Sequence, residues 1–148
     1  MRMLMRRAST DRVIVLLDTL LTHTVPVRDL YKSACCQAAH GHFPHLRPLL
    51  DTHYEHQLRL VDVLVYRICA LGGTRRALPP TAMRGYVTHD RLLCGLLDAH
   101  EFVLHAAQTT EPNSVQTDTS PYCDFAVGRL VLTNDLQRDA VRTALLRL

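Results

Sequence analysis

The chain has 148 residues, of which 47% are hydrophobic and 21% charged, and its formal net charge is +3. This length predicts one domain over residues 1–148, with room for a substantial core. The small net charge does not by itself indicate a nucleic-acid-binding protein. Aromatic residues make up only 5% and tryptophan is absent, so Leu, Val and Ala must fill the core. That composition favours helices over a β-sandwich.

The cysteines and the apolar segments predict where the protein resides. The five cysteines form no CxxC pair, and their number is odd. No signal peptide is evident, because no apolar segment of adequate length follows the basic start of the chain. The run from Val13 to Leu21 is interrupted by Asp18 and is too short to cross a bilayer. These features predict a cytoplasmic protein with reduced thiols and no membrane partner.

The first predicted helix extends from Ser9 to about Ala39, where apolar residues recur with the 3.6-residue period. Residues 1–8 are expected to form a short basic tail before it. Pro26 lies inside this helix, and we expect it to kink or break the helix because proline has no N–H to donate.

The second predicted helix runs from about Leu46 to Leu71. Pro48 is tolerated only in the first turn of a helix, which places the true start near Arg47. The pair Gly72-Gly73 predicts the end of this helix. Residues 74–87 are rich in Pro and Arg and predict a connector.

The third predicted helix runs from Thr88, which suits an N-cap, to Gln108. Ser120 and Pro121 predict the N-cap and first residue of a last helix that continues to about Leu146. Four helices with a long second-to-third connection predict an all-α, ferritin-like four-helix bundle. Apolar helix faces left outside the core favour further assembly.

A di-iron site inside one such bundle needs Glu on two helices and Glu-x-x-His on the other two. This sequence has no Glu-x-x-His, and its only glutamates are Glu55, Glu101 and Glu111. We therefore do not expect a carboxylate di-iron site within one chain. A site shared between subunits remains.

A set of residues follows in order along the chain from the end of the first predicted helix: Leu30-Tyr31, Phe43, Asp51, Asp62, Arg67 and Leu71-Gly72-Gly73. Through these residues the segment 31–73 resembles the DNA-binding proteins from starved cells, the Dps-type mini-ferritins. The resemblance implies a hollow homo-oligomer, a dodecamer built from two-fold dimers, that oxidises and stores iron (Fe²⁺/Fe³⁺) at sites shared across the two-fold interfaces.

Carried over position by position, the resemblance implies an incomplete metal site. Asp51 and Asp62 match the two family aspartates, whereas Cys35 and Arg47 stand at the histidine positions and Tyr66 at the glutamate position. A guanidinium cannot donate a lone pair to a metal. We expect Arg47 to pair with Asp51 or with Asp62 of a partner subunit. The ferroxidase site is therefore expected to be degraded, and no catalytic residue is assigned.

The remaining histidines leave two interpretations open. His40, His42 and His45 precede the second helix, and His53 and His56 share a helix face at i,i+3 spacing. These residues, or Tyr66, could bind Zn²⁺, Cu²⁺ or Fe²⁺ at a displaced site. The favoured alternative is that His42 and His45 pack under the loop and the others are solvated. His100 and His105, near Glu101, are expected on a helix surface.

The cysteines also have two interpretations. Cys35, beside Cys36, could bind a soft metal or sense an oxidant as a thiolate. Packing as a small apolar residue is the favoured role. Cys69, Cys94 and Cys123 are expected to fill the core or an interface.

DNA binding is the other property that the family resemblance implies. Arg2, Arg6 and Arg7 are the expected phosphate contacts, with a second basic spot at Arg75 and Arg76. Many copies on one particle would multiply weak contacts, and the protein would then be nucleoid-associated.

The sequence thus favours a Dps-like protein for iron binding and storage and for stress protection of DNA, with a degraded intersubunit site. The alternative is a structural or nucleoid-associated shell that has lost its metal chemistry. Another type of helical bundle is the third possibility.

Overall fold

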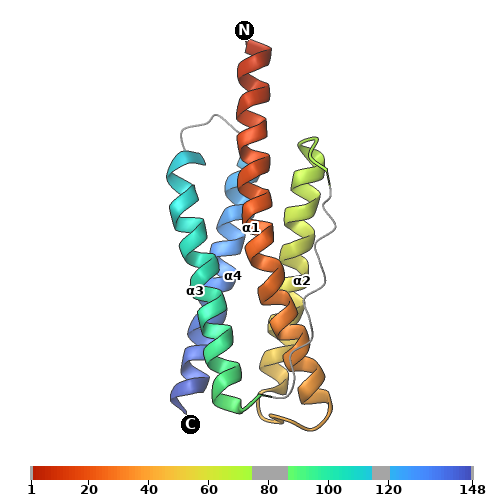
Figure 1. Ribbon diagram of the computed structural model, residues 1–148, viewed down its shortest axis with the longest axis vertical. Coiled ribbons are helices and arrows are strands. Elements are labelled where there is room, and N and C mark those ends of the chain that lie inside the picture. Colours follow the sequence, from red (N-terminus) through yellow and green to blue (C-terminus); the bar gives the residue numbers. More distant parts are fainter. Residues whose placement is uncertain (1, 75–86, 115–120, 148) are drawn as a thin grey trace.

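The computed structural model describes residues 2–74, 87–114 and 121–147, without the side chains of Arg6, 110–114 and 121–124. The described residues form four helices and no strand. The helices are α1 (Arg2–Ala39), α2 (Arg47–Ala70), α3 (His89–Ser114) and α4 (Pro121–Leu146). They lie side by side as one bundle (Figure 1), so the predicted all-α four-helix architecture is confirmed.

Each helix of the bundle packs against two others. Helix α1 contacts α2 and α3, and α4 contacts the same two helices from the other side. Helices α2 and α3 run in the same direction, from the end of the bundle that carries the C-terminus (Figure 1). The end of α2 and the start of α3 therefore lie at opposite ends of the bundle.

Helix α1 differs from the prediction at two points. It begins at Arg2 instead of Ser9, and its first turns project beyond the other helices (Figure 1). It also continues through Pro26, so of the predicted kink or break the break does not occur. A proline in a helix interior costs about 3 kcal/mol. Pro26 is exposed, however, and its neighbours Val25 and Val27 are 5% and 1% exposed. Burial of apolar side chains on both sides offsets the lost hydrogen bond.

Helix α2 begins and ends as predicted. It starts at Arg47, with Pro48 in its first turn. It ends where Gly72 adopts a φ of +92°, a left-handed conformation that favours glycine. The N–H of Gly73 then donates to the Ile68 carbonyl at 2.9 Å. A Cβ at Gly73 would lie 2.7 Å from Ile68 Cγ2, so the second glycine allows a close approach.

The limits of α3 and α4 agree in part with the predictions. Thr88 caps α3, because its Oγ1 accepts a hydrogen bond from the Arg91 N–H at 3.4 Å. Helix α3 ends at Ser114, beyond the predicted Gln108. Pro121 is the first residue of α4 as predicted, whereas Ser120 lies outside the described residues.

The core is built mainly from leucine and valine, as the composition predicted. All four helices contribute, and in none of them do the described residues hold an apolar stretch long enough to cross a membrane. The largest fully buried apolar side chains include Leu17, Leu20, Leu50, Leu60, Leu64, Leu93, Leu96 and Leu130.

Candidate functional site

Three of the residues singled out by the family resemblance meet where α1 lies against the start of α2. Arg47 and Asp51 are one helical turn apart, and Arg47 Nε lies 3.9 Å from Asp51 Oδ2. Both side chains are 58% exposed. The expected ion pair between Arg47 and Asp51 is confirmed, although solvent weakens it at this exposure.

Cys35, on α1, lies against the same carboxylate. The pKa of the Cys35 thiol is raised to about 12, mainly by burial and to a smaller extent by a hydrogen bond to Asp51. The thiol is therefore protonated at neutral pH and acts as the donor to Asp51. The thiolate that the oxidant-sensing hypothesis requires is disfavoured, and the packing interpretation of Cys35 is supported.

Asp62 and Tyr66 form a separate exposed pair further along α2. They are one helical turn apart, and Tyr66 is 70% exposed. Asp51 and Asp62 are eleven residues apart on one helix, which corresponds to about 16 Å. One metal ion cannot bind both aspartates of the same chain. A site that uses both therefore requires two chains.

The described part of the chain holds no group of three or more His, Cys, Asp or Glu side chains placed to bind a metal ion. His56 is exposed, as expected, but His53 is only 9% exposed and faces the core. The solvated interpretation is wrong for His53. His42 and His45 are exposed instead of packed under the loop.

The structure reveals a polar cluster that the sequence reasoning missed. Tyr31 is fully buried at the centre of the bundle, and its Oη lies 2.6 Å from His100 Nε2 and 3.0 Å from His53 Nδ1. His100 Nδ1 lies 2.8 Å from Asn134 Oδ1. All four helices contribute to this core network, which we define as Tyr31, His53, Gln57, His100, Asn134 and Gln137.

The hydrogen bonds of the core network have a fixed direction. Asn134 Nδ2 donates to the Leu130 carbonyl at 2.8 Å, so Asn134 Oδ1 is the acceptor for His100 Nδ1–H. His100 Nε2 is then unprotonated and accepts from the Tyr31 hydroxyl. The Tyr31 oxygen in turn accepts from His53 Nδ1–H. Each histidine is thereby held in one tautomer.

Burial sets the protonation states in this network. Burial lowers the pKa of His100 to about 4, and nearby Arg138 acts in the same direction, whereas the hydrogen bond to Asn134 opposes it. Burial lowers the pKa of His53 to about 4 as well, with contributions from His100 and His56. Burial also raises the pKa of Tyr31 well above its usual value. At neutral pH both imidazoles and the phenol are uncharged.

Two glutamines extend the core network towards α4. Gln57 Nε2 donates to Gln137 Oε1 at 2.9 Å, and Gln137 Nε2 donates to the His53 carbonyl at 3.3 Å. Gln57 Oε1 is buried and has no hydrogen-bond partner among the described residues. A buried amide oxygen without a partner costs stability, and a bound water molecule would satisfy it.

The sequence did hold a signal for His100. It lies four residues after Leu96 and three before Val103, positions that share one helix face. Both of these neighbours are fully buried, as is His100. The expectation of a surface position is wrong for His100, because His100 lies on the apolar face of α3. A polar residue at an apolar position of the period was the available signal.

The remaining candidate residues lie at the surface. Arg2 and Arg7 are exposed on the projecting start of α1. Arg75 and Arg76 lie outside the described residues, as does the side chain of Arg6. Cys69 and Cys94 are exposed free thiols, so they do not fill the core of this chain, and the side chain of Cys123 lies outside the description.

Comparison with known proteins supports the fold. No family model and no curated protein sequence matches the chain. The structure is similar to that of DpsC from Streptomyces coelicolor, with a TM-score of 0.83 and 26% sequence identity. The similarity covers 93% of this chain and 86% of the DpsC chain. The Dps-type ferritin-like fold expected from residues 31–73 is thereby confirmed.

Proposed function

Because this chain has the Dps-type ferritin-like fold, we propose that it assembles into a homo-oligomeric shell that binds and stores iron and protects DNA under stress. In this proposal the intersubunit oxidation site is degraded. Asp51 and Asp62 of a partner subunit are the remaining iron ligands, and the shell is a dodecamer built from two-fold dimers.

The state of Asp51 supports the degraded site. Its carboxylate faces the Arg47 guanidinium at 3.9 Å and also accepts a hydrogen bond from the Cys35 thiol. Fe²⁺ would have to replace both partners, and neither of them can supply the neutral nitrogen of a histidine. The arrangement favours slow iron oxidation and weak Fe²⁺ affinity.

The outer surface of the bundle supports assembly. Large apolar side chains on all four helices are more than half exposed in the single chain. Such faces commonly mark protein contacts. They are Met3, Leu4, Met5, Val15, Tyr66, Phe102, Phe125, Leu132, Leu136 and Leu146. Light scattering of the purified protein would contradict the shell if it gave the mass of a monomer.

Iron oxidation tests the degraded site directly. We expect the wild-type protein to oxidise Fe²⁺ slowly, as followed by ultraviolet absorbance. The double substitution Cys35→His with Arg47→His should raise both the rate and the Fe²⁺ affinity, because it restores two imidazole ligands. Arg59→His is the matched control, since Arg59 is an exposed arginine on the same helix, paired with Glu55 at 2.6 Å. Rapid turnover by the wild-type protein would refute the degraded site.

The second candidate is a structural or nucleoid-associated shell without metal chemistry. The same Arg47–Asp51 pair favours it, because a fixed cation occupies the place where Fe²⁺ would neutralise the carboxylate. Iron content after loading separates the two candidates. A shell that retains no iron, while the double histidine variant does, would select the second.

DNA binding is tested separately through the start of α1. Arg2 and Arg7 are exposed there, and in a shell these arginines would be repeated on every subunit. We expect wild-type protein to retard DNA in a gel at low salt and the Arg2→Ala, Arg7→Ala double variant to do so less. No retardation by the wild-type protein would remove DNA binding from the proposal.

A further inference from the structure

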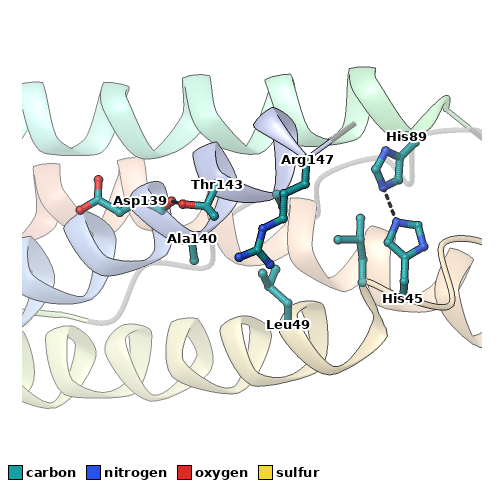
Figure 2. A pocket seen from close by; sticks show the side chains of 9 residues that line it. His45, Leu49, His89, Asp139, Ala140, Thr143 and Arg147 are labelled. Carbon is teal, nitrogen blue, oxygen red and sulfur yellow. Dashed lines mark hydrogen bonds between the residues drawn. The ribbon is translucent and has the colours of Figure 1, made fainter.

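Two histidines face each other at the end of the bundle where the loop between α1 and α2 meets the start of α3. His45 Nε2 and His89 Nε2 are 2.9 Å apart, and the ring centroids are 4.8 Å apart. Figure 2 shows the two rings pointing their nitrogens at one another. In a metal-free pair one of these nitrogens donates its hydrogen and the other accepts it with its lone pair.

The surroundings of His89 orient its lone pair towards His45. His89 Nδ1 lies 3.8 Å from Asp90 Oδ1, and the Phe43 ring packs beside the imidazole with a centroid distance of 5.6 Å. A carboxylate beside Nδ1 favours the tautomer with the proton on that atom. Nε2 of His89 is then unprotonated. Histidine ligands of metals commonly donate a hydrogen bond from the other ring nitrogen to a carboxylate; at 3.8 Å Asp90 acts on His89 through its charge and not through a hydrogen bond.

We propose that His45 and His89 bind a divalent transition-metal ion of the Zn²⁺ type through their two Nε2 atoms. Imidazole nitrogen suits Zn²⁺, Cu²⁺ and Ni²⁺. Tetrahedral zinc with bonds of about 2.0–2.1 Å needs its two nitrogens about 3.4 Å apart. The rings must therefore separate by about half an ångström. On binding, the His45 proton moves from Nε2 to Nδ1, so both Nε2 atoms donate a lone pair and no proton is lost.

A pocket beside the two rings provides room for further ligands. Its volume is about 620 Å³, and Leu46, Leu49 and Arg147 line it together with both histidines. No other His, Cys, Asp or Glu of the described chain completes a three-ligand group with them. The open coordination positions would be filled by water or a small anion, whose charge Arg147 would balance.

The acidic side chain of this pocket is not a metal ligand in the structure. Asp139 lies at the opposite end of the pocket from the two rings (Figure 2). Its carboxylate is 3.5 Å from Arg138 Nε and 3.9 Å from Arg142 Nη1. These two cations hold it away from the histidines. The proposed ion is thus bound by two protein ligands.

The metal would connect two segments that are far apart in the sequence, since His45 and His89 are separated by 44 residues. Binding should therefore stabilise the folded chain, by an amount that grows with the logarithm of the free ion concentration once that concentration exceeds the dissociation constant. The ligands differ from Asp51 and Asp62, so this site is independent of the proposed iron function.

Zinc titration of the full-length reduced protein tests the site. We expect calorimetry to detect one Zn²⁺ per chain that His45→Gln and His89→Gln each abolish. The matched control is His105→Gln, because His105 is an exposed histidine on α3. A second control, Asp51→Asn with Asp62→Asn, separates this site from the proposed iron site. Zn²⁺ should also raise the melting temperature of the wild-type and control proteins, but not of the two site variants.

Anomalous X-ray scattering from zinc-soaked crystals locates the ion. A peak between the two Nε2 atoms would support the proposal. The proposal is overturned if His45→Gln and His89→Gln bind zinc as the wild-type protein does, or if the bound ion lies only at cysteines or at Asp51 and Asp62. Circular dichroism of the metal-free variants checks that substitution of the exposed His45 and of the partly buried His89 leaves the fold intact.

Discussion

The core network around Tyr31 and the exposed cluster around Asp51 are both built from polar side chains, but their environments differ. Tyr31 and His100 are 0% exposed, and hydrogen bonds of 2.6–3.0 Å join them to their neighbours. Arg47 and Asp51 are 58% exposed and 3.9 Å apart. A buried polar group that loses its partner pays the full desolvation cost, whereas an exposed one exchanges its partner for water. Stability should therefore depend on the first region and metal chemistry on the second.

Removing His100 should have the largest effect on stability. His100→Ala deletes a buried side chain that is both the acceptor for the Tyr31 hydroxyl and the closest donor to Asn134 Oδ1. We expect the free energy of unfolding to fall by about 3–5 kcal/mol, measured by urea denaturation. His105→Ala on the same helix is the control, since His105 is exposed, and it should change stability by no more than about 0.5 kcal/mol. If His100→Ala and His105→Ala lowered the free energy of unfolding equally, the buried network would be no more important for stability than an exposed side chain.

The second-largest effect is expected from acid, which should lower the free energy of unfolding through the buried His100. The pKa of His100 is 6.5 in its ordinary state and about 4 in the folded chain. The unfolded chain therefore binds a proton at higher pH than the folded chain does. This contribution to stability is complete above about pH 6.5 and is lost as the pH falls towards 4, by about 3 kcal/mol in all.

The groups that face His100 also favour its uncharged form, so they too predict that stability falls as the pH is lowered. Tyr31 on α1 and His53 on α2 are uncharged at neutral pH, and Arg138 on α4 is positive and repels an imidazolium. Urea denaturation at about pH 7 and about pH 4.5 should show the loss in the wild-type protein and a smaller loss in His100→Gln. An unchanged pH dependence in that variant would place the acid sensitivity elsewhere.

Removing one hydroxyl from the core network should have an intermediate effect. Tyr31→Phe keeps the ring but leaves His53 Nδ1–H and His100 Nε2 without their shared partner. We expect a loss of about 2 kcal/mol in the free energy of unfolding. Tyr66→Phe is the matched control, because Tyr66 is 70% exposed and its hydroxyl is accessible to water. A loss in Tyr31→Phe no larger than in Tyr66→Phe would show that the network adds nothing to stability.

Removing the exposed ion pair should have the smallest effect. Arg47→Ala deletes a contact of 3.9 Å between two side chains that are both more than half exposed. Exposed pairs contribute little, so the free energy of unfolding should change by no more than about 0.5 kcal/mol. Thermal denaturation of this variant beside Arg59→Ala measures both exposed pairs of α2 under the same conditions. A loss above about 1 kcal/mol would mean that Arg47 has a structural role.

The sequence by itself determined the local features of the fold. Pro48, Gly72-Gly73, Thr88 and Pro121 marked helix limits that the structure reproduces. Each of these signals acts on its own backbone or on residues within one helical turn, so neighbouring residues are sufficient to interpret it. The resemblance of residues 31–73 added the fold family. A break of α1 at Pro26 was expected and does not occur, because the propensity of one residue does not measure the packing of Val25 and Val27 on either side of it.

Only the tertiary structure decided which polar residues meet. Tyr31 and His100 are 69 residues apart and share a hydrogen bond, and the Cys35 thiol reaches Asp51 from another helix. Such contacts depend on how far each helix is rotated about its axis, and a rotation of one residue position moves a side chain by about 100°. The packing of Leu and Val in the core sets that rotation. The sequence therefore identified the candidate ligands, and the packing decided which of them are buried and which face solvent.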